Sequence, residues 1–355
     1  MAELPHASMV ETLALCAPGT PLRAGLDRIL QARRGCLVVL SDDPHVLGVS
    51  TGGFLLDAEF TPQRLSELAK MDGAIVLARD AGRIARANVH LTPKASVPTS
   101  ETGTRHRTAE RVARSLGIGV ITVSAAMSTI SVFVGDVKRT LQPPARLIDR
   151  ASQALATMQR FRERFDAGLA VLTTAEIGAQ VSIDDVVDVL QPAAIMARIA
   201  DEVAEELVEL GFDGRLIALQ LSELVGGVES SALGVVADYV MVADERPTVR
   251  AVEVWGAMRS LGGDDIHSGA AYADLLAIGG SPEEVLSSRG YRALQGVPRL
   301  SGILVERLVA RFGSFTALRQ ATTAELESVE GVGSARASSI KAVLGRLGES
   351  NGNGR

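Results

Sequence analysis

The chain is poor in aromatic residues and in cysteine, and each shortage excludes something. Phe, Trp and Tyr make up 3% of the 355 residues, so a hydrophobic core must be built from aliphatic side chains. Cys16 and Cys36 are too few for a disulfide framework and stand at no metal-ligand spacing, so we interpret both as buried thiols in a reducing compartment. No apolar run reaches membrane-spanning length, and no basic region followed by an apolar stretch opens the chain. We therefore expect a soluble cytoplasmic protein.

Charge is distributed unevenly along the sequence. The chain has a net charge of -6, and its length and its 46% hydrophobic residues suffice for two or three domains. Residues 167–245 hold 15 acidic and 2 basic residues, whereas residues 289–355 hold 10 basic and 5 acidic ones. An acidic middle cannot lie along DNA, but a basic end can, because it releases counterions from the phosphates. Two ordinary solvated faces would explain the charges equally well.

The first segment, residues 1–145, predicts strands alternating with helices. Helices are expected over residues 61–70, with Thr61 as N-cap, and over residues 104–116, where Gly117 ends the helix. Short apolar runs rich in branched residues predict buried strands at 35–41, 74–78, 118–124 and 130–134. Strands with interleaved helices indicate an α/β or α+β domain.

Residues 146–290 predict an all-helical connector. The sequence Gln142-Pro-Pro144 breaks the preceding pattern and marks a boundary. Helical spacing of apolar residues then predicts helices over 145–165, 183–190, 195–210 and 216–224, with carboxylates on the opposite face in the acidic part. A further helix start is expected at Ser281-Pro-Glu-Glu.

The last segment, residues 291–349, has two related halves, and residues 350–355 predict a flexible tail. Val297-Pro-Arg-Leu-Ser301 precedes one helix that runs to Phe312, and Val329-Glu-Gly-Val-Gly-Ser334 precedes another that runs to Leu347. Further helix between residues 316 and 327 connects them. The pattern predicts a tandem of helix-hairpin-helix units.

The run from Gly103 to Glu110 combines a helix start with cationic and hydroxyl side chains. Unpaired N–H groups at a helix start attract phosphate, and Arg105 and Arg107 can add forked, charge-assisted hydrogen bonds. Thr104 and Thr108 lie four residues apart on one helical face. The run therefore indicates polyphosphate binding. The alternative is a surface helix whose arginines pair with Glu101 and Glu110.

The sequence Asp72-Gly73-Ala74 lies between a predicted helix and a predicted strand, where the sites of open α/β sheets gather. The Asp72 carboxylate can hold a divalent cation or accept a proton from a sugar hydroxyl, and Gly73 leaves room for a nucleotide. The alternative is a plain turn, because Asp-Gly is a common turn pair.

The second turn of the C-terminal tandem carries the candidate DNA contacts. Gly331 and Gly333 let the turn approach a phosphate, Ser334 begins the next helix, and Arg336 and Lys341 add positive charge. The first turn lacks the paired glycines. No array of side chains suited to reading base edges is evident, so we expect backbone recognition without sequence preference; a helix-capping turn is the alternative.

Three stretches carry a resemblance to a known family. Residues 60–77, with Asp72-Gly73-Ala74, then Ala87-Asn-Val-His-Leu91, then residues 98–111, with Arg105-His-Arg107, resemble the diadenylate cyclase domain of the DNA integrity scanning proteins. The resemblance covers essentially the whole chain. It implies a cyclase domain with a central mixed sheet flanked by helices, an all-α connector and a C-terminal helix-hairpin-helix domain. It also implies condensation of two ATP into cyclic di-AMP with release of pyrophosphate.

The resemblance implies roles for individual residues. Asp72 is expected at the ribose hydroxyl and at a Mg²⁺ or Mn²⁺ ion, Gly73 gives the nucleotide room, and Leu91 borders the adenine. Thr104, Arg105, His106, Arg107 and Thr108 are expected to bind the phosphates, and Ser124 is a further candidate contact. Asp72, Arg105, His106 and Arg107 are the expected catalytic residues. A homo-octamer that binds branched DNA as an integrity checkpoint is the implied assembly.

One position departs from the family. After the strand that ends at Ser124, many relatives carry an arginine where this chain has Met127. The missing charge keeps a second interpretation open: a DNA-binding scaffold or repair protein whose nucleotide site is only a sensor. A third interpretation is a purely structural oligomer. His90 lies beside Leu91, and two interpretations are open: it edges the nucleotide site, or it is a structural histidine, which we favour.

Overall fold

The computed structural model describes residues 8–242, 246–279 and 285–349. Contacts divide the chain into two compact units. The first comprises Met1–Ser152 and Val203–Leu219, and the second comprises Gln153–Glu202 and Gln220–Arg355. The helix start expected at Ser281 and the tail expected at 350–355 lie outside the described residues. The predicted domain boundaries at residues 145 and 290 stay predictions.

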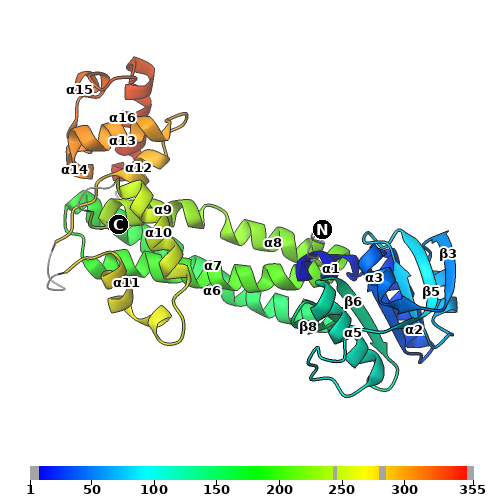
Figure 1. The fold of residues 1–355 in the computed structure, drawn as a ribbon. Coiled ribbons are helices and arrows are strands. Elements are labelled where there is room, and N and C mark those ends of the chain that lie inside the picture. The colour runs from blue at the N-terminus through cyan, green and yellow to red at the C-terminus, as the bar shows by residue number, and fades with distance from the viewer. Residues whose placement is uncertain (1–7, 243–245, 280–284, 350–355) are drawn as a thin grey trace. The chain divides into compact units, whose positions relative to one another are not determined.

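The first unit is built on one mixed sheet (Figure 1). Its order is β2-β5-β4-β1-β6-β7-β8, and β3 also pairs with β5. Strand β1 is parallel to β4 and antiparallel to β6, as the resemblance led us to expect of a mixed sheet. The strands span Cys36–Leu40 (β1), Ser50–Thr51 (β2), Phe54–Glu59 (β3), Ala74–Leu77 (β4), Arg83–Leu91 (β5), Gly119–Ser124 (β6), Thr129–Val134 (β7) and Val137–Thr140 (β8).

Helices pack on both faces of this sheet. One aliphatic cluster joins the strands to α1, α2 and α4 and contains Leu26, Leu65 and Ile121. The other joins them to α3 and α5 and contains Val112, Val120 and the aromatic Phe133. The helices span Met9–Leu15 (α1), Pro21–Gln31 (α2), Pro44–Gly48 (α3), Pro62–Leu68 (α4) and Thr104–Leu116 (α5). Cys16 and Cys36 are free and buried, as predicted for the two thiols.

Local signals set the ends of two helices as predicted. The Thr61 hydroxyl accepts a hydrogen bond from the backbone N–H of Arg64 at 3.1 Å, and Pro62 occupies the first turn of α4. Gly117 ends α5 in the left-handed conformation, with φ of 64°. Strands β2, β3, β5 and β8 were not predicted from the sequence pattern.

The region after the sheet is helical. The helices span Pro144–Gly178 (α6), Ile183–Leu210 (α7), Arg215–Val225 (α8), Val228–Tyr239 (α9), Pro247–Arg259 (α10) and Gly269–Leu275 (α11). Short 3₁₀ turns lie at Gly211–Gly214 and Asp265–His267. Helices α6 and α7 pack closely in the second unit. Gly168 of α6 allows this approach, since a Cβ atom there would lie only 2.9 Å from the carbonyl oxygen of Asp188 in α7.

The acidic middle also holds an apolar stretch. Ile183–Tyr239, which includes α7, α8 and α9, contains an 18-residue window with a mean hydropathy of 1.2. On this measure the expectation that no stretch reaches spanning length does not hold. Length and composition alone do not distinguish a membrane span from a helix that packs against protein, and we assign no membrane contact to it.

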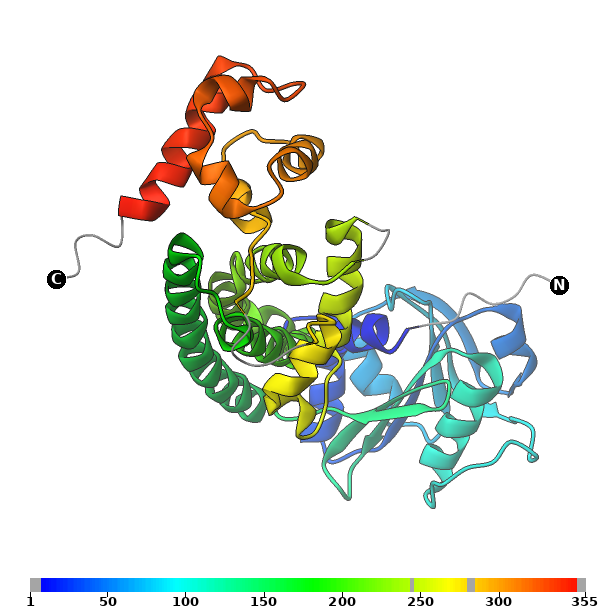
Figure 2. The same cartoon turned by 90° about the vertical axis from the view of Figure 1, so that its left-hand side faces the viewer.

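Five short helices form the C-terminal segment of the second unit. They span Tyr291–Gln295 (α12), Gly302–Phe312 (α13), Phe315–Gln320 (α14), Thr323–Glu327 (α15) and Ser334–Glu349 (α16). Contacts of α16 with α12, α14 and α15 gather them into a small bundle, drawn in orange to red in Figure 2. Helices α13 and α16 agree with the sequence prediction, whereas α12 was not predicted and the helix expected between residues 316 and 327 is divided into α14 and α15. The helix-hairpin-helix assignment itself stays a prediction.

Candidate functional site

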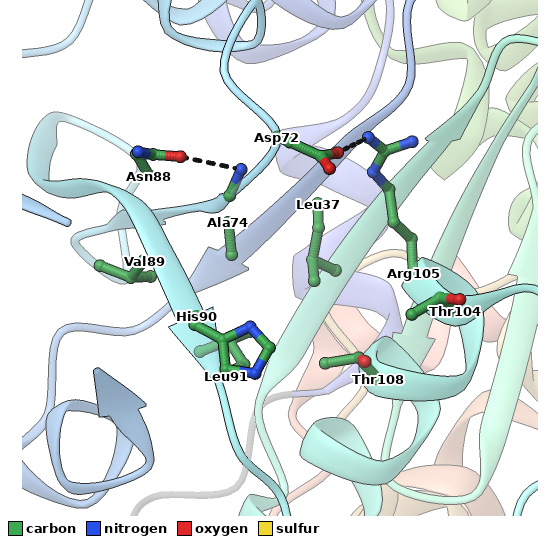
Figure 3. Close-up of a pocket in the computed structure, with 11 residues that line it drawn as sticks. Leu37, Asp72, Ala74, Asn88, Val89, His90, Leu91, Thr104, Arg105 and Thr108 are labelled. Atoms are coloured by element: carbon green, nitrogen blue, oxygen red, sulfur yellow. Dashed lines mark hydrogen bonds and ion pairs between the residues drawn. The ribbon is translucent and has the colours of Figure 1, made fainter. Parts of the chain in front are cut away.

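A pocket of about 320 Å³ lies in the first unit where β5 ends and α5 begins (Figure 3). The lining residues come from β1, β5, α5, the segment that leads into β4 and the first residue of β4. They are Leu37, Asp72, Gly73, Ala74, Asn88, Val89, His90, Leu91, Thr104, Arg105 and Thr108. The pocket thus unites two motifs that lie about thirty residues apart in the sequence, and its size suits one small ligand.

The start of α5 supplies the pocket's positive end. The N-cap residue, Gly103, offers no side chain to the first N–H groups of the helix, and the first turn contains no acidic residue. These unpaired donors and the helix dipole favour an anion. Thr104, Arg105 and Thr108 of the same helix face the pocket, so hydroxyls and a guanidinium stand beside the donors. The arrangement suits a phosphate group.

An ion pair crosses the pocket. An Nη atom of Arg105 donates to the carboxylate of Asp72 (Figure 3). The Asp72 side chain is 94% exposed, so solvent screens the pair and it contributes little to stability. A ligand with its own charges can therefore replace either partner.

Gly35 shapes the space that Arg105 occupies. A Cβ atom at Gly35 would lie 2.6 Å from Nη1 of Arg105 and 3.3 Å from the carbonyl oxygen of Val123. The missing side chain lets the guanidinium lie against the backbone just before β1. Gly35 was not a candidate from the sequence, because its contact with Arg105 joins residues that are far apart in the chain.

The other side of the pocket belongs to β5. Leu91 lines it as expected, and Asn88 and Val89 do so without having been predicted. The Asn88 side chain accepts a hydrogen bond from the backbone N–H of Gly73 at 3.1 Å (Figure 3). The segment Ala87-Asn-Val-His-Leu91 was the available signal, because it carried part of the resemblance.

The interpretation of His90 as a structural histidine is wrong. Its side chain is exposed, and its ring lies in the pocket near Leu91 and Thr108 (Figure 3). Its neighbours Val89 and Leu91 are buried and also line the pocket, so the three consecutive residues border it together.

Three predicted site residues do not line the pocket: His106, Arg107 and Ser124. The His106 ring is buried and meets Phe133 edge-on at a centroid distance of 6.3 Å, and burial lowers its pKa, so it is neutral near pH 7. Arg107 donates to the carbonyl oxygen of Thr102 at 3.2 Å. The Ser124 hydroxyl accepts from the N–H of Met127 at 3.3 Å. Their roles in phosphate binding stay predictions.

The surface-helix alternative, in which the arginines of α5 pair with Glu101 and Glu110, holds for Arg114 but not for Arg105 or Arg107. Glu101 pairs with Lys138 at 2.5 Å, and Glu110 pairs with Arg114 at 3.0 Å. Glu110 also accepts hydrogen bonds from Thr99 and Ser100, which lower its pKa against the opposing effect of burial. These glutamates hold the loop before α5 and leave Arg105 to the pocket.

The pocket offers a single carboxylate to a cation. Across the described ranges 8–242, 246–279 and 285–349, no group of three His, Cys, Asp or Glu side chains is arranged to hold a metal ion. Asp72 is the only acidic residue in the pocket lining. This donor set fits Mg²⁺ or Mn²⁺ only when the ligand's own phosphates complete the coordination, as magnesium sites commonly require.

The turn before α16 contains most of the candidate DNA contacts. Gly331 adopts φ of 93°, and a Cβ atom there would lie 2.8 Å from a methyl group of Leu304. Gly331, Gly333 and Ser334 are exposed, and Arg336 donates to the carbonyl oxygen of Gly331 at 2.8 Å. The turn is therefore a fixed, solvent-facing loop at a helix start.

Lys341 has a different place. Its ammonium group donates to the carbonyl oxygens of Arg319 and Ala321 at 3.0 and 2.7 Å, at the end of α14. In the first turn, Arg299 adopts the left-handed conformation with φ of 61°, the counterpart of Gly331 in the second. The two turns therefore share a backbone conformation although only one has the paired glycines.

Family models match most of the chain. The model for the nucleotide-binding domain of the DisA bacterial checkpoint controller matches residues 23–137, and the model for the linker region of the same controller matches residues 141–285. The pocket residues from Leu37 to Thr108 lie within the first match.

Curated relatives extend the match to nearly the full length. The DNA integrity scanning protein DisA of Kineococcus radiotolerans is 45% identical over 348 residues, which cover 98% of this chain and 97% of that protein. The protein of the same name from Streptomyces coelicolor is 44% identical over 346 residues, covering 97% and 92%. The chain belongs to the DNA integrity scanning protein DisA family and is a diadenylate cyclase.

Proposed function

We propose that this cyclase condenses two ATP molecules into cyclic di-AMP in the pocket at the start of α5 and releases two pyrophosphates. The observation that carries the proposal is the presence of Asp72 and the positive N-terminus of α5 in one pocket, joined through Arg105. A 3′-hydroxyl of one ATP attacks the α-phosphorus of the other, in line with the departing pyrophosphate. Such chemistry depends on positioning and on neutralising phosphate charge.

The residues divide the work between the two ends of the nucleotide. Thr104, Arg105 and Thr108, with the free N–H groups of α5, hold phosphate oxygens, and Arg105 stabilises charge on the leaving group. Leu91 packs against the base, and Gly73 lets the ribose approach the backbone. Asp72 lies at the ribose hydroxyl. His106, Arg107 and Ser124 would contact phosphate only after moving from their present hydrogen bonds or packing.

Mg²⁺ or Mn²⁺ held by Asp72 and by phosphate oxygens supplies positive charge to the triphosphate when bound. ATP binding replaces the Asp72–Arg105 ion pair, so the carboxylate is freed for the cation as the guanidinium takes a phosphate. An ion pair this exposed is weak, and the exchange is therefore favourable.

One pocket of about 320 Å³ accommodates one nucleotide, so the second ATP must come from another subunit. The reaction occurs twice and is symmetric, which two identical pockets facing each other across a two-fold axis satisfy. We therefore propose a homo-oligomer, an octamer by the family resemblance.

The C-terminal turns extend the proposal to DNA. Exposed N–H groups at Gly331, Gly333 and Ser334 would meet a backbone phosphate, and Arg336 would add charge after releasing the Gly331 carbonyl. Lys341 would act indirectly, by fixing the end of α14. Several such tails in one oligomer would favour branched DNA, and the two activities together would form a DNA-integrity checkpoint in the cytoplasm, at the nucleoid.

The test is product analysis. We expect the purified chain to convert ATP with Mn²⁺ or Mg²⁺ into cyclic di-AMP, and Asp72→Asn to lower that rate at least about 100-fold while the protein stays folded. An Asp72→Asn variant with an unchanged rate would refute the site assignment, and an active monomer would refute the paired pockets. ATP binding without any product would favour the sensor function. The observation behind that alternative is the exposed Met127, which stands where an arginine is expected.

DNA binding has its own test. Retardation of branched and linear DNA in gels should weaken as salt increases, because phosphate contacts release counterions. Binding that is insensitive to salt would contradict backbone recognition by the C-terminal turns. Junction DNA that leaves cyclic di-AMP formation unchanged would contradict the coupling.

A further inference from the structure

Asn88 has an unusual backbone for a residue within a strand. It adopts φ of 56°, in the left-handed region that Asn tolerates better than most residues. The register between β4 and β5 shifts here: Ala74 pairs with Val89, but Val76 pairs with Arg86, so β5 has one residue more than β4 between these pairs. Asn88 thus belongs to a β-bulge, a feature that turns a side chain away from the regular ladder.

This bulge supports the segment that carries Asp72. The amide oxygen of Asn88 accepts the backbone N–H of Gly73 at 3.1 Å. A Cβ atom at Gly73 would lie 2.4 Å from the carbonyl carbon and 2.5 Å from the Cα of Asn88, so the two backbones are in direct contact. Asp72 precedes Gly73, and in the described part of the chain its carboxylate bonds only to Arg105.

We infer that Asn88 is a positioning residue for Asp72. It fixes the Asp72–Gly73 peptide against β5 through one hydrogen bond and through the bulge, and thereby sets where the carboxylate stands after ATP has taken Arg105. The inference rests on the proposed role of Asp72 and adds the residue that holds it in place. Asn combines two properties that this position requires: an acceptor oxygen on a short side chain, and tolerance of a left-handed backbone.

The two properties can be separated by substitution. Asn88→Gly keeps the left-handed backbone and removes the acceptor. Asn88→Asp keeps an acceptor oxygen on the same short side chain. Ala81→Gly is the matched control, because Ala81 also has a left-handed backbone, with φ of 57°, in the turn that leads into β5 at the end away from the pocket.

The measurements are kcat, KM for ATP, the Mn²⁺ concentration that gives half the maximal rate, and the melting temperature. We expect Asn88→Gly to lower kcat at least tenfold and to raise the required Mn²⁺ severalfold, with KM for ATP within about threefold, because the phosphate contacts of α5 are intact. Asn88→Asp should recover most of kcat, and Ala81→Gly should match the unsubstituted chain.

Two outcomes would overturn the inference. One is an Asn88→Gly variant with unchanged kcat and Mn²⁺ requirement. The other is an Asn88→Asp variant as impaired as Asn88→Gly, which would mean that the acceptor plays no part; this second variant decides the matter if Asn88→Gly fails to fold. Asp72→Asn in the same assay separates the two proposals: if it is inactive while Asn88→Gly is normal, the site assignment stands and only the inference about Asn88 fails.

Discussion

Two of the arginine–carboxylate pairs in this chain have opposite surroundings. In the pocket, Asp72 is 94% exposed and has Arg105 as its partner. In the second unit, Glu176, Asp238, Tyr239 and Arg292 form a buried polar cluster. There Asp238 is 1% exposed and accepts the backbone N–H groups of Gly290, Tyr291 and Arg292, and Glu176 accepts from Tyr239 and Arg292. Ion pairing alone therefore does not identify a site.

What differs is whether a ligand can compete. The N-terminus of α12 is closed by Asp238, a carboxylate of the chain itself, whereas the N-terminus of α5 has only Gly103 as its cap. A helix start whose N–H groups already have an acceptor within the chain has no need of phosphate, whereas one without such an acceptor can bind it. The buried polar cluster thus ties α9 and α6 to the C-terminal bundle, and the pocket remains available to substrate.

The largest effect should come from the buried polar cluster. Arg292→Met leaves the Glu176 carboxylate, whose side chain is 2% exposed, without its charged partner. Breaking a buried pair in this way costs about 3–5 kcal/mol of folding free energy. Urea unfolding of the full chain measures it. Arg160→Met, at an exposed position of α6, is the control and should change stability by less than about 0.5 kcal/mol. Equal stabilities would mean that the pair holds nothing together.

A pH dependence should follow from the same cluster. Burial, and then the nearby Glu176 carboxylate, raise the pKa of Asp238 from its ordinary value of 3.8 to about 7. Between these values the folded protein keeps a proton that the unfolded chain has released, so the contribution of Asp238 to stability is fully present below about pH 4 and is lost as the pH rises to about 7. The fall is at most roughly 4 kcal/mol.

Urea unfolding at several pH values measures this dependence, with Asp238→Asn as the comparison. The amide cannot ionise, so the variant should lose that part of the slope between pH 4 and 7. A variant whose slope equals that of the unsubstituted chain would assign the dependence to other groups.

The pocket should respond in the opposite way to the same kind of change. Arg105→Ala should lower the rate of cyclic di-AMP formation about 100-fold, because it removes a donor aimed at phosphate, while the melting temperature hardly moves. Arg105→Lys keeps the charge without the fork and should recover only part of the rate. A large drop in melting temperature with a normal rate would mean that Arg105, like Arg292, stabilises the fold and does not bind phosphate.

The comparison also separates what the sequence could predict from what it could not. The cap at Thr61, the end of α5 at Gly117 and the location of Arg105 at a helix start follow from neighbouring residues, and the structure has them as expected. Strand β5 was missed because Arg83, Arg86 and the bulge at Asn88 interrupt its alternation. The Asp72–Arg105 pair spans 33 positions and Asp238 reaches the start of α12 across more than 50, so no local pattern reports either.

Side-chain direction was the other limit. The sequence led us to favour a structural role for His90 and a phosphate-binding role for His106, but His90 faces the pocket, whereas His106 packs on Phe133. Which face of a strand or helix is buried depends on elements that pack there, and Phe133 of β7 becomes a neighbour of α5 only in the folded sheet.

The smallest expected effect tests how finely Arg105 must be placed. Gly35→Ala puts a methyl group where Nη1 of Arg105 lies, 2.6 Å from the new Cβ. Gly35 has no left-handed backbone, so alanine is tolerated by the chain and the guanidinium moves instead. Displacing the guanidinium enough to relieve this contact should slow cyclic di-AMP formation about tenfold with little change in melting temperature. Gly48→Ala, where nothing lies within 4 Å of the new Cβ, is the control. If Gly35→Ala is as active as Gly48→Ala, the Arg105 guanidinium can bind phosphate from more than one position. The pocket would then tolerate displaced side chains as well as broken ion pairs, unlike the buried polar cluster.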